Sequence, residues 1–176
     1  MKINKNKFQV NLEDGQEGEK QLAEILLKQG AIIQPLYQYE PTKTPYLFFD
    51  DNFTPLVAPD ILVIRGGVVT FAECKRKHGW TKNWMYDGRL ETGLDNRLFL
   101  QYVRLYELSK IPIEIYFIHE DEEPVGIYRI TINEQNYHEL LSGRQELRRI
   151  DKIPKNNNEH TCMTFFDIED LEKIMD

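Results

Sequence analysis

The sequence has few cysteines, no long apolar run and no internal repeat. Its two cysteines, Cys74 and Cys162, do not have the spacing of a metal-binding motif, so we expect reduced thiols in a cytoplasmic setting. No stretch of about 18 apolar residues occurs, which argues against a membrane contact through a spanning helix. The first five residues lack the apolar core of a secretory signal. The length predicts one domain over residues 1–176.

The formal net charge of −7 argues against a protein that coats nucleic acid without specificity. The charge is unevenly distributed, however. Between residues 75 and 110, eight lysines and arginines outnumber four acids, which gives +4 locally and −11 for the remainder. This basic segment suits a focused contact with phosphate groups, or it forms a solvated helix face with charge pairs four residues apart.

Two β-rich runs flank the Gly-Gly pair at 66–67, which suits the positive φ angles of a tight two-residue turn. Pairing outward from that turn places Asp60 directly opposite Glu73, with Cβ atoms about 4.5–5.5 Å apart. Lys75 is two residues beyond Glu73 and points to the same face. Two acids beside an ammonium group pack poorly and make a good metal site.

An ordinary surface salt bridge is the alternative interpretation of these charges. Both faces of the hairpin are mainly apolar, since Leu62 and Phe71 share the face of Asp60 while Ile61 and Ala72 lie on the other. Strands of this kind are covered on both sides, where a charge is unfavourable unless it is paired or bound to metal. Two opposed acids also repel each other unless a proton or cation lies between them. The pattern therefore favours a functional site.

The remaining pattern predicts an α/β fold with a mixed sheet. Apolar spacing indicates a helix over 15–29 that turns Glu19 inward. Gln101, within the apolar stripe of a second helix, is either a satisfied core residue or a hydrogen-bonding group near the site. The other expected elements are a strand over 31–39, an insertion at 40–56 with a small hairpin at 46–53, a loop over 78–94, the second helix over 95–109, strands over 113–118 and 125–132, a short helix between 133 and 143, a loop over 151–161, a strand over 163–167 and a terminal helix from 168.

The pattern Pro59-Asp60 followed by Glu73-Cys74-Lys75 resembles the signature of the PD-(D/E)xK nuclease superfamily. Upstream, Gly15-x-x-Gly18-Glu19 is similar to the first helix of its Holliday-junction-resolvase-like members. The resemblance covers about residues 15–118. It implies a restriction-endonuclease-like core, a mixed β-sheet flanked by helices in the order αβββαβ, with residues 40–56 inserted and a C-terminal extension from about 133. One departure is that Leu105 stands where related nucleases often have tyrosine.

The resemblance implies that Asp60, Glu73 and Glu19 hold a divalent cation together with the backbone carbonyl of Cys74. Oxygen ligands and a phosphate substrate favour Mg²⁺, with Mn²⁺ able to substitute. The metal would activate a water, and Lys75 would orient that water and stabilise the transition state. The expected activity is metal-dependent endonuclease hydrolysis of DNA phosphodiester bonds, with RNA open as a substrate.

The cations that follow the site are expected to contact flanking phosphates; they are Arg76, Lys77, His78 and Lys82. Trp80 and Trp84 either stack on unpaired bases or anchor a loop in the core. A second basic group at 144–149 has no assigned role. A homodimer is expected by analogy only. The alternative functions are a non-catalytic nucleic-acid-binding or assembly protein on the same fold, and a structural protein whose acids merely pair with nearby cations.

Overall fold

The computed structural model describes residues 7–36, 46–49, 55–83, 88–141, 148–149 and 162–175. Its helices are α1 (Lys7–Lys28), α2 (Asn96–Ser109), α3 (Tyr137–Leu141) and the 3-10 helix η1 (Ile168–Asp170). Its strands are β1 (Ile32–Pro35), β2 (Tyr46–Phe48), β3 (Pro55–Val57), β4 (Ile61–Arg65), β5 (Val68–Lys77), β6 (Thr81–Asn83), β7 (Arg89–Asp95), β8 (Ile113–His119), β9 (Gly126–Ile132), β10 (Arg148–Arg149), β11 (Cys162–Asp167) and β12 (Glu172–Met175).

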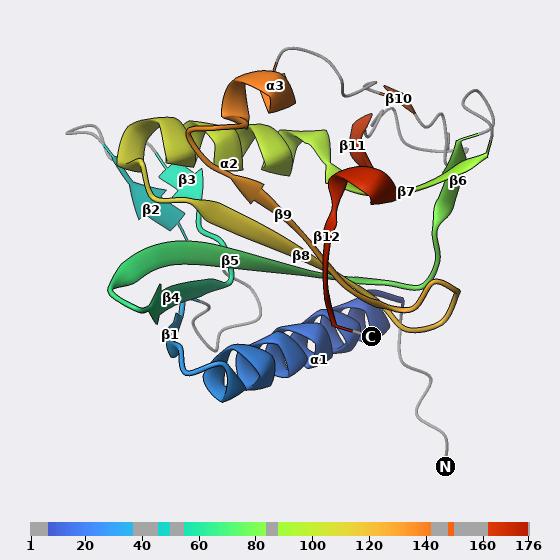
Figure 1. The fold of residues 1–176 in the computed structure, drawn as a ribbon, viewed down its shortest axis with the longest axis horizontal. Coiled ribbons are helices and arrows are strands. Elements are labelled where there is room, and N and C mark those ends of the chain that lie inside the picture. The colour runs from blue at the N-terminus through green and yellow to red at the C-terminus, as the bar shows by residue number, and fades with distance from the viewer. Residues whose placement is uncertain are drawn as a thin grey trace.

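A six-stranded mixed sheet in the order β1-β4-β5-β8-β9-β12 forms the centre of the molecule. β5 and β8 are parallel and are connected through α2, whereas the other neighbours are antiparallel. α1 lies along one face of this sheet and α2 along the other (Figure 1). The structure confirms the predicted fold class, a mixed sheet flanked by helices, and the predicted order αβββαβ is followed by α1, β1, β4, β5, α2 and β8.

Apolar side chains pack on both faces of the sheet. On one face Leu22 of α1 packs in a cluster with Ala72 of β5. On the other face Tyr102 of α2 belongs to a cluster with Phe71 of the same strand. All seven residues of β8 are buried, as expected for a central strand covered on both sides. A charge on β5 that points into either layer therefore lies largely away from water.

A second sheet, in the order β10-β11-β7-β6, corrects one prediction. The sequence predicts a loop over 78–94, but this segment contains β6 and β7. β7 forms because it pairs with β11, about 70 residues later in the chain, over five residue pairs. An added Cβ at Gly93 would lie 2.4 Å from the carbonyl oxygen of Thr164, so this close pairing requires glycine.

The predicted C-terminal helix is also wrong. The chain makes only the single turn η1 and then pairs β12 with β9 as the edge of the central sheet. Arg129 of β9 binds Glu172 of β12 at 2.5 Å, which anchors that edge. A helix would leave both the β9 edge and this arginine without these partners.

Other boundaries differ less. α1 begins at Lys7 rather than at residue 15, and β1 covers 32–35 of the predicted 31–39 strand. The hairpin predicted at 46–53 exists, but its second strand is Pro55–Val57. The predicted loop at 151–161 lies outside the described residues.

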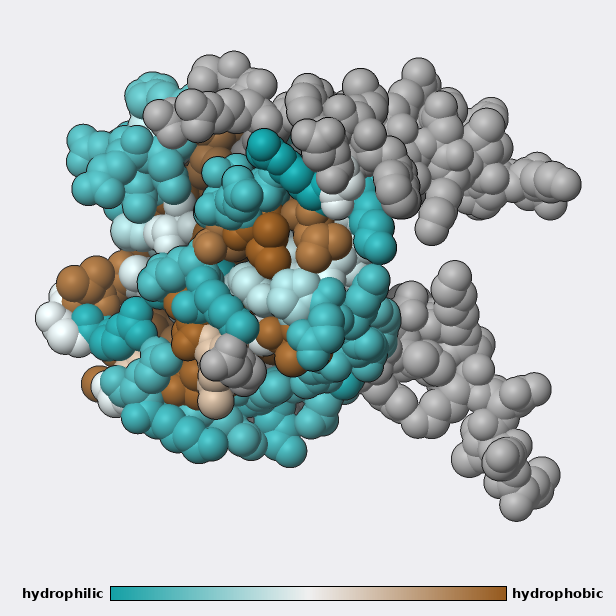
Figure 2. Space-filling model, turned by 45° about the vertical axis from the view of Figure 1, so that its right-hand side comes forward, coloured by the Kyte–Doolittle hydropathy of each residue, from teal (hydrophilic) through white to brown (hydrophobic). Residues whose placement is uncertain are grey.

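Hydrophilic residues cover most of the outer surface on the side shown in Figure 2, and apolar residues show between them. None of the described helices has the length and apolar composition needed to cross a bilayer.

Candidate active site

The hairpin turn between β4 and β5 has the predicted geometry. Gly66 and Gly67 have φ angles of 59° and 83°, which glycine adopts without strain. The register pairs Ile61 with Ala72, as the sequence predicts. Asp60 and Glu73 are the next two positions in that register.

Asp60 is held at the beginning of β4 by hydrogen bonds from two directions. The backbone N–H of Leu36 donates to its carbonyl at 2.8 Å, and the backbone N–H of Cys74 donates to its Oδ2 at 2.8 Å. Three residues earlier, the N–H of Val57 donates to Oε1 of Gln101 at 2.8 Å. The side-chain oxygen of Gln101 is therefore satisfied by the backbone, and it fixes the segment that leads into Asp60.

Glu73 is a buried acid with one satisfied and one unsatisfied oxygen. Its Oε1 pairs with Nζ of Lys75, which confirms that these side chains share a face. The residue is 2% exposed, and its Oε2 has no hydrogen-bond partner within the described part of the chain. Leaving a buried carboxylate oxygen unpaired destabilises a fold, so such atoms mark places that serve another purpose.

The acids and Lys75 share one electrostatic environment. Burial raises the pKa of Asp60 well above its usual range, and Glu73 and Glu19 add repulsion that Lys75 partly offsets. Burial also raises the pKa of Glu19, again with Glu73 adding to the effect. Burial alone would lower the pKa of Lys75, but Glu73 and Asp60 raise it above its ordinary value, so its ammonium group stays protonated.

Glu19 approaches the site because α1 packs tightly against β5. An added Cβ at Gly18 would lie 3.2 Å from Sγ of Cys74 and 3.3 Å from Cβ of Arg76. Any larger residue would crowd the strand, so Gly18 permits the close approach that brings the next residue near the acids. Glu19 is partly buried there, as its predicted inward position requires.

The side chain of Cys74 lies on the face of β5 opposite to that of Glu73 and Lys75. Its thiol packs in the apolar cluster under α1, and burial raises its pKa far above the usual range for cysteine. The thiol is therefore protonated and unsuited to bind a metal. Only the backbone carbonyl of this residue stays a predicted ligand.

The cations expected to contact phosphate point in different directions and have different partners in the structure. Strand alternation places Lys77 on the face of Glu73 and directs Arg76 to the other face. Arg76 pairs with Glu120 at 2.5 Å. His78 lies 2.8 Å from Asp121, and Lys82 is exposed on β6.

Trp80 anchors the core rather than presenting a stacking surface. Its ring stacks on His119 at 3.8 Å, and its indole N–H donates to the carbonyl of Pro124 at 3.2 Å. Trp84 and Arg144 lie outside the described residues, and Arg148 and Arg149 form β10.

The sequence does not predict the polar group at the end of β8. His119 is 2% exposed, its Nε2 lies 3.2 Å from Oγ1 of Thr92, and its Nδ1 has no hydrogen-bond partner within the described residues. The register of β5 and β8 places it beside Lys77. The signal was weak, because Thr92 belongs to a strand that the sequence does not predict.

No group of three His, Cys, Asp or Glu side chains in the described ranges is gathered at metal-binding distance. The donor chemistry nevertheless suits a hard divalent cation. Asp60, Glu73 and Glu19 offer only oxygen atoms, they repel one another, and one buried oxygen of Glu73 is unsatisfied.

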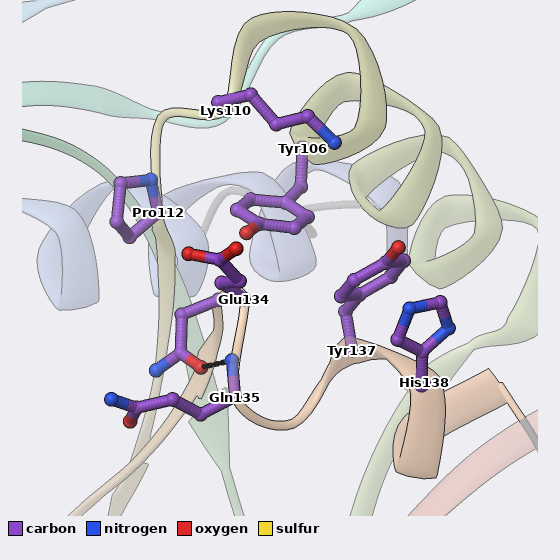
Figure 3. A pocket seen from close by; sticks show the side chains of 8 residues that line it. Tyr106, Lys110, Pro112, Glu134, Gln135, Tyr137 and His138 are labelled. Carbon is purple, nitrogen blue, oxygen red and sulfur yellow. Dashed lines mark hydrogen bonds between the residues drawn. The ribbon is translucent and has the colours of Figure 1, made fainter.

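A separate cavity of about 710 Å³ lies where α2 ends, between that helix and the segment that precedes α3. Figure 3 shows Tyr106 and Tyr137 on its walls, and Nζ of Lys110 lies 5.5 Å from the ring centre of Tyr106. None of the acidic residues of the hairpin lines it. The cavity and the acidic site are therefore distinct features.

No protein-family model matches the chain, and no curated protein matches it in sequence. Among solved structures, it is similar to Hjc, a Holliday junction resolvase of the archaeal hyperthermophile Archaeoglobus fulgidus. The TM-score is 0.43 and the sequence identity 15%, and the match covers 70% of this chain and 92% of that one.

Proposed function

We propose that this protein is a metal-dependent endonuclease that hydrolyses phosphodiester bonds in DNA. The observation that carries the proposal is Oε2 of Glu73, a buried carboxylate oxygen beside Asp60 and Lys75 that has no hydrogen-bond partner among the described residues. We also propose a cytoplasmic location and, by analogy with related nucleases, a homodimer.

Asp60, Glu73 and Glu19, with the backbone carbonyl of Cys74, would hold Mg²⁺, and Mn²⁺ could replace it. When bound, the ion polarises the phosphate, lowers the pKa of a water and offsets charge on the leaving oxygen. The protonated Lys75 orients the attacking water and stabilises negative charge on the phosphoryl oxygens.

Of the flanking cations, Arg76, Lys77, His78 and Lys82, Lys77 is the one that shares the face of the acids. The others would contact phosphates farther from the reaction. These contacts position a nucleic-acid strand without reading its sequence.

A non-catalytic DNA-binding protein on the same fold is the second candidate. The acidic site argues against it, because three carboxylates repel a phosphate unless a cation reverses their field. A protein that only binds DNA has no use for a buried acid with an unpaired oxygen.

The test is a cleavage panel over linear, nicked, branched and single-stranded DNA with Mg²⁺ or with chelator. We expect cleavage with Mg²⁺ only, and a loss of at least about 100-fold in Asp60→Asn, Glu73→Gln and Lys75→Ala. Glu107→Gln, which changes a half-buried acid of α2 that pairs with Arg104, is the matched control and should cut normally. Full activity in any of the three site variants would remove that residue from the mechanism.

A further inference from the structure

Lys77 is a cation whose position is fixed by neighbouring strands. It ends β5 on the face that carries Glu73 and Lys75. Its ammonium group donates a hydrogen bond to the carbonyl of Gly93 in β7 and lies 5.8 Å from the ring centre of Phe117 in β8. Its position is thus defined before any ligand binds.

The charge of Lys77 is not matched by an acid among the residues that the structure describes. Within the described part of the chain, no carboxylate forms a salt bridge with it, in contrast to Arg76, which pairs with Glu120. Burial lowers the pKa of Lys77 to about 8, and repulsion from Lys75 adds to the effect.

The groups around Lys77 do not neutralise it. Phe117 and the Gly93 carbonyl carry no full charge. On β8, burial and the nearby Lys77 lower the pKa of His119 to about 4, so that imidazole is neutral. Glu122 acts on His119 in the opposite direction but contributes no effect to Lys77. An arriving anion would therefore stabilise Lys77 more than water does.

On the basis of the nuclease activity proposed above, we propose that Lys77 binds the phosphate adjacent to the scissile one, and that efficient cleavage requires this second phosphate. The Cα atoms of residues two apart on a strand, such as Lys75 and Lys77, are separated by about 6.6 Å. This separation is close to that of successive phosphates in a nucleic-acid strand. With Lys75 at the reacting phosphate, Lys77 lies one phosphate farther along. An ammonium group binds phosphate as a point charge, so it needs no second donor in fixed geometry.

A purely structural role makes a different prediction. If Lys77 only ties β5 to the carbonyl of Gly93, then its removal should impair every reaction of the site equally. A role in binding a second phosphate should affect only those substrates that have one.

The experiment compares Lys77→Met, which removes the charge and keeps the stem, with Lys77→Arg, which keeps the charge. Lys110→Met, in the cavity at the other end of α2, is the control. Each protein is assayed on an oligonucleotide and on bis(p-nitrophenyl) phosphate, a diester with a single phosphate. We expect Lys77→Met to lose about 10-fold or more in kcat/KM on DNA and nothing on the small diester. Lys77→Arg should retain most of the activity.

A second arm places a neutral methylphosphonate on either side of the scissile phosphate. One of these substitutions should slow the wild type as much as Lys77→Met does, and combining the two changes should cause no further loss. Normal DNA cleavage by Lys77→Met, or equal losses on both substrates, would overturn the inference.

A wild type that hydrolyses neither substrate would overturn the nuclease function instead. In that case, measurements of equilibrium DNA binding test separately whether Lys77 contacts a phosphate. Equal affinities of Lys77→Met and Lys110→Met would rule out the phosphate contact, whereas a weaker affinity of Lys77→Met, with a salt slope smaller by about one, would support it.

Discussion

Asp60 is a buried acid in an environment that favours its protonated form. Its exposed fraction is 6%, and burial together with repulsion from Glu73 and Glu19 raises its pKa. Ionised Asp60 therefore opposes folding of the metal-free protein, and a divalent cation would reverse this effect.

We expect Asp60→Asn to stabilise the metal-free protein at pH 7 by about 1–2 kcal/mol. Between pH 3.8 and the raised pKa, the folded wild type binds more protons than the unfolded chain, so its stability falls as the pH rises through that interval. Asp60→Asn has no carboxyl group at this position, so its stability should not fall in this way as the pH rises. Urea denaturation with chelator at pH 4 and pH 8 measures it, and parallel pH profiles for the two proteins would contradict the assignment.

For Lys77 we predict that burial makes the stability of the wild type depend on pH in the direction opposite to that predicted for Asp60. Its pKa is about 8 in the folded protein and 10.5 in the unfolded chain, so between these values the unfolded chain binds more protons and stability rises with pH. Lys77→Met should add about 1–2 kcal/mol at pH 7, and this gain should shrink as the pH rises from 8 to 10.5. Denaturation at pH 7 and pH 10 tests this. A variant that is less stable than the wild type at both pH values would show that the hydrogen bond to Gly93 outweighs the burial of charge.

The positions of single side chains could be predicted where they depend on local backbone geometry. The glycine pair and the two-residue period of a strand fix which side chains share a face, so Asp60, Glu73 and Lys75 could be placed from sequence. The surroundings of Lys77 could not, because Gly93 and Phe117 are brought to it by other strands.

At the scale of elements, the contact between α1 and β5 decides whether Glu19 reaches the other acids. Gly18 lies at that contact, whereas an added Cβ at Gly15 on the same helix would meet nothing within 4 Å. Substitutions at the two glycines can therefore be compared to test this contact.

Gly18→Val should destabilise the protein by about 1–3 kcal/mol and weaken metal binding, since it pushes α1 and Glu19 away from β5. Gly15→Val should be neutral or slightly stabilising, because glycine inside a helix is unfavourable. Thermal unfolding and metal titration of both variants test the contact. Equal effects at the two positions would mean that the close approach is unimportant.

Elements were missed where pairing is long-range. β7 has Thr92 and Gly93 in its interior and becomes a strand through β11, and β12 forms because β9 offers it an edge. Neither partner is visible in a local pattern. In contrast, α2 has a strong apolar periodicity and β8 is mainly apolar, and both were predicted correctly.

At the scale of the whole molecule, a charged network joins the last strands of the sheet. Arg129 of β9 binds Glu114 of β8 at 2.9 Å and Glu172 of β12 at 2.5 Å, and Tyr116 donates to Glu114 at 2.6 Å. Glu114 is 6% exposed, so it depends on this arginine.

Arg129→Met should destabilise the fold by about 3–5 kcal/mol, because it leaves the buried Glu114 without its main counter-charge. Adding Glu114→Gln should restore part of the loss, since the unpaired charge is then gone. Denaturation of the single and double variants measures the coupling. Additive effects would show that the network is not a unit.

The central claim is that Asp60 and Glu73 together hold a divalent cation, and Mn²⁺ binding measures this most directly. Titration of the wild type and Glu73→Gln, followed by electron paramagnetic resonance of free Mn²⁺, needs no substrate and no turnover. We predict binding by the wild type and a loss of affinity of more than about 10-fold in Glu73→Gln. Equal affinities, or no binding by the wild type, would contradict the claim.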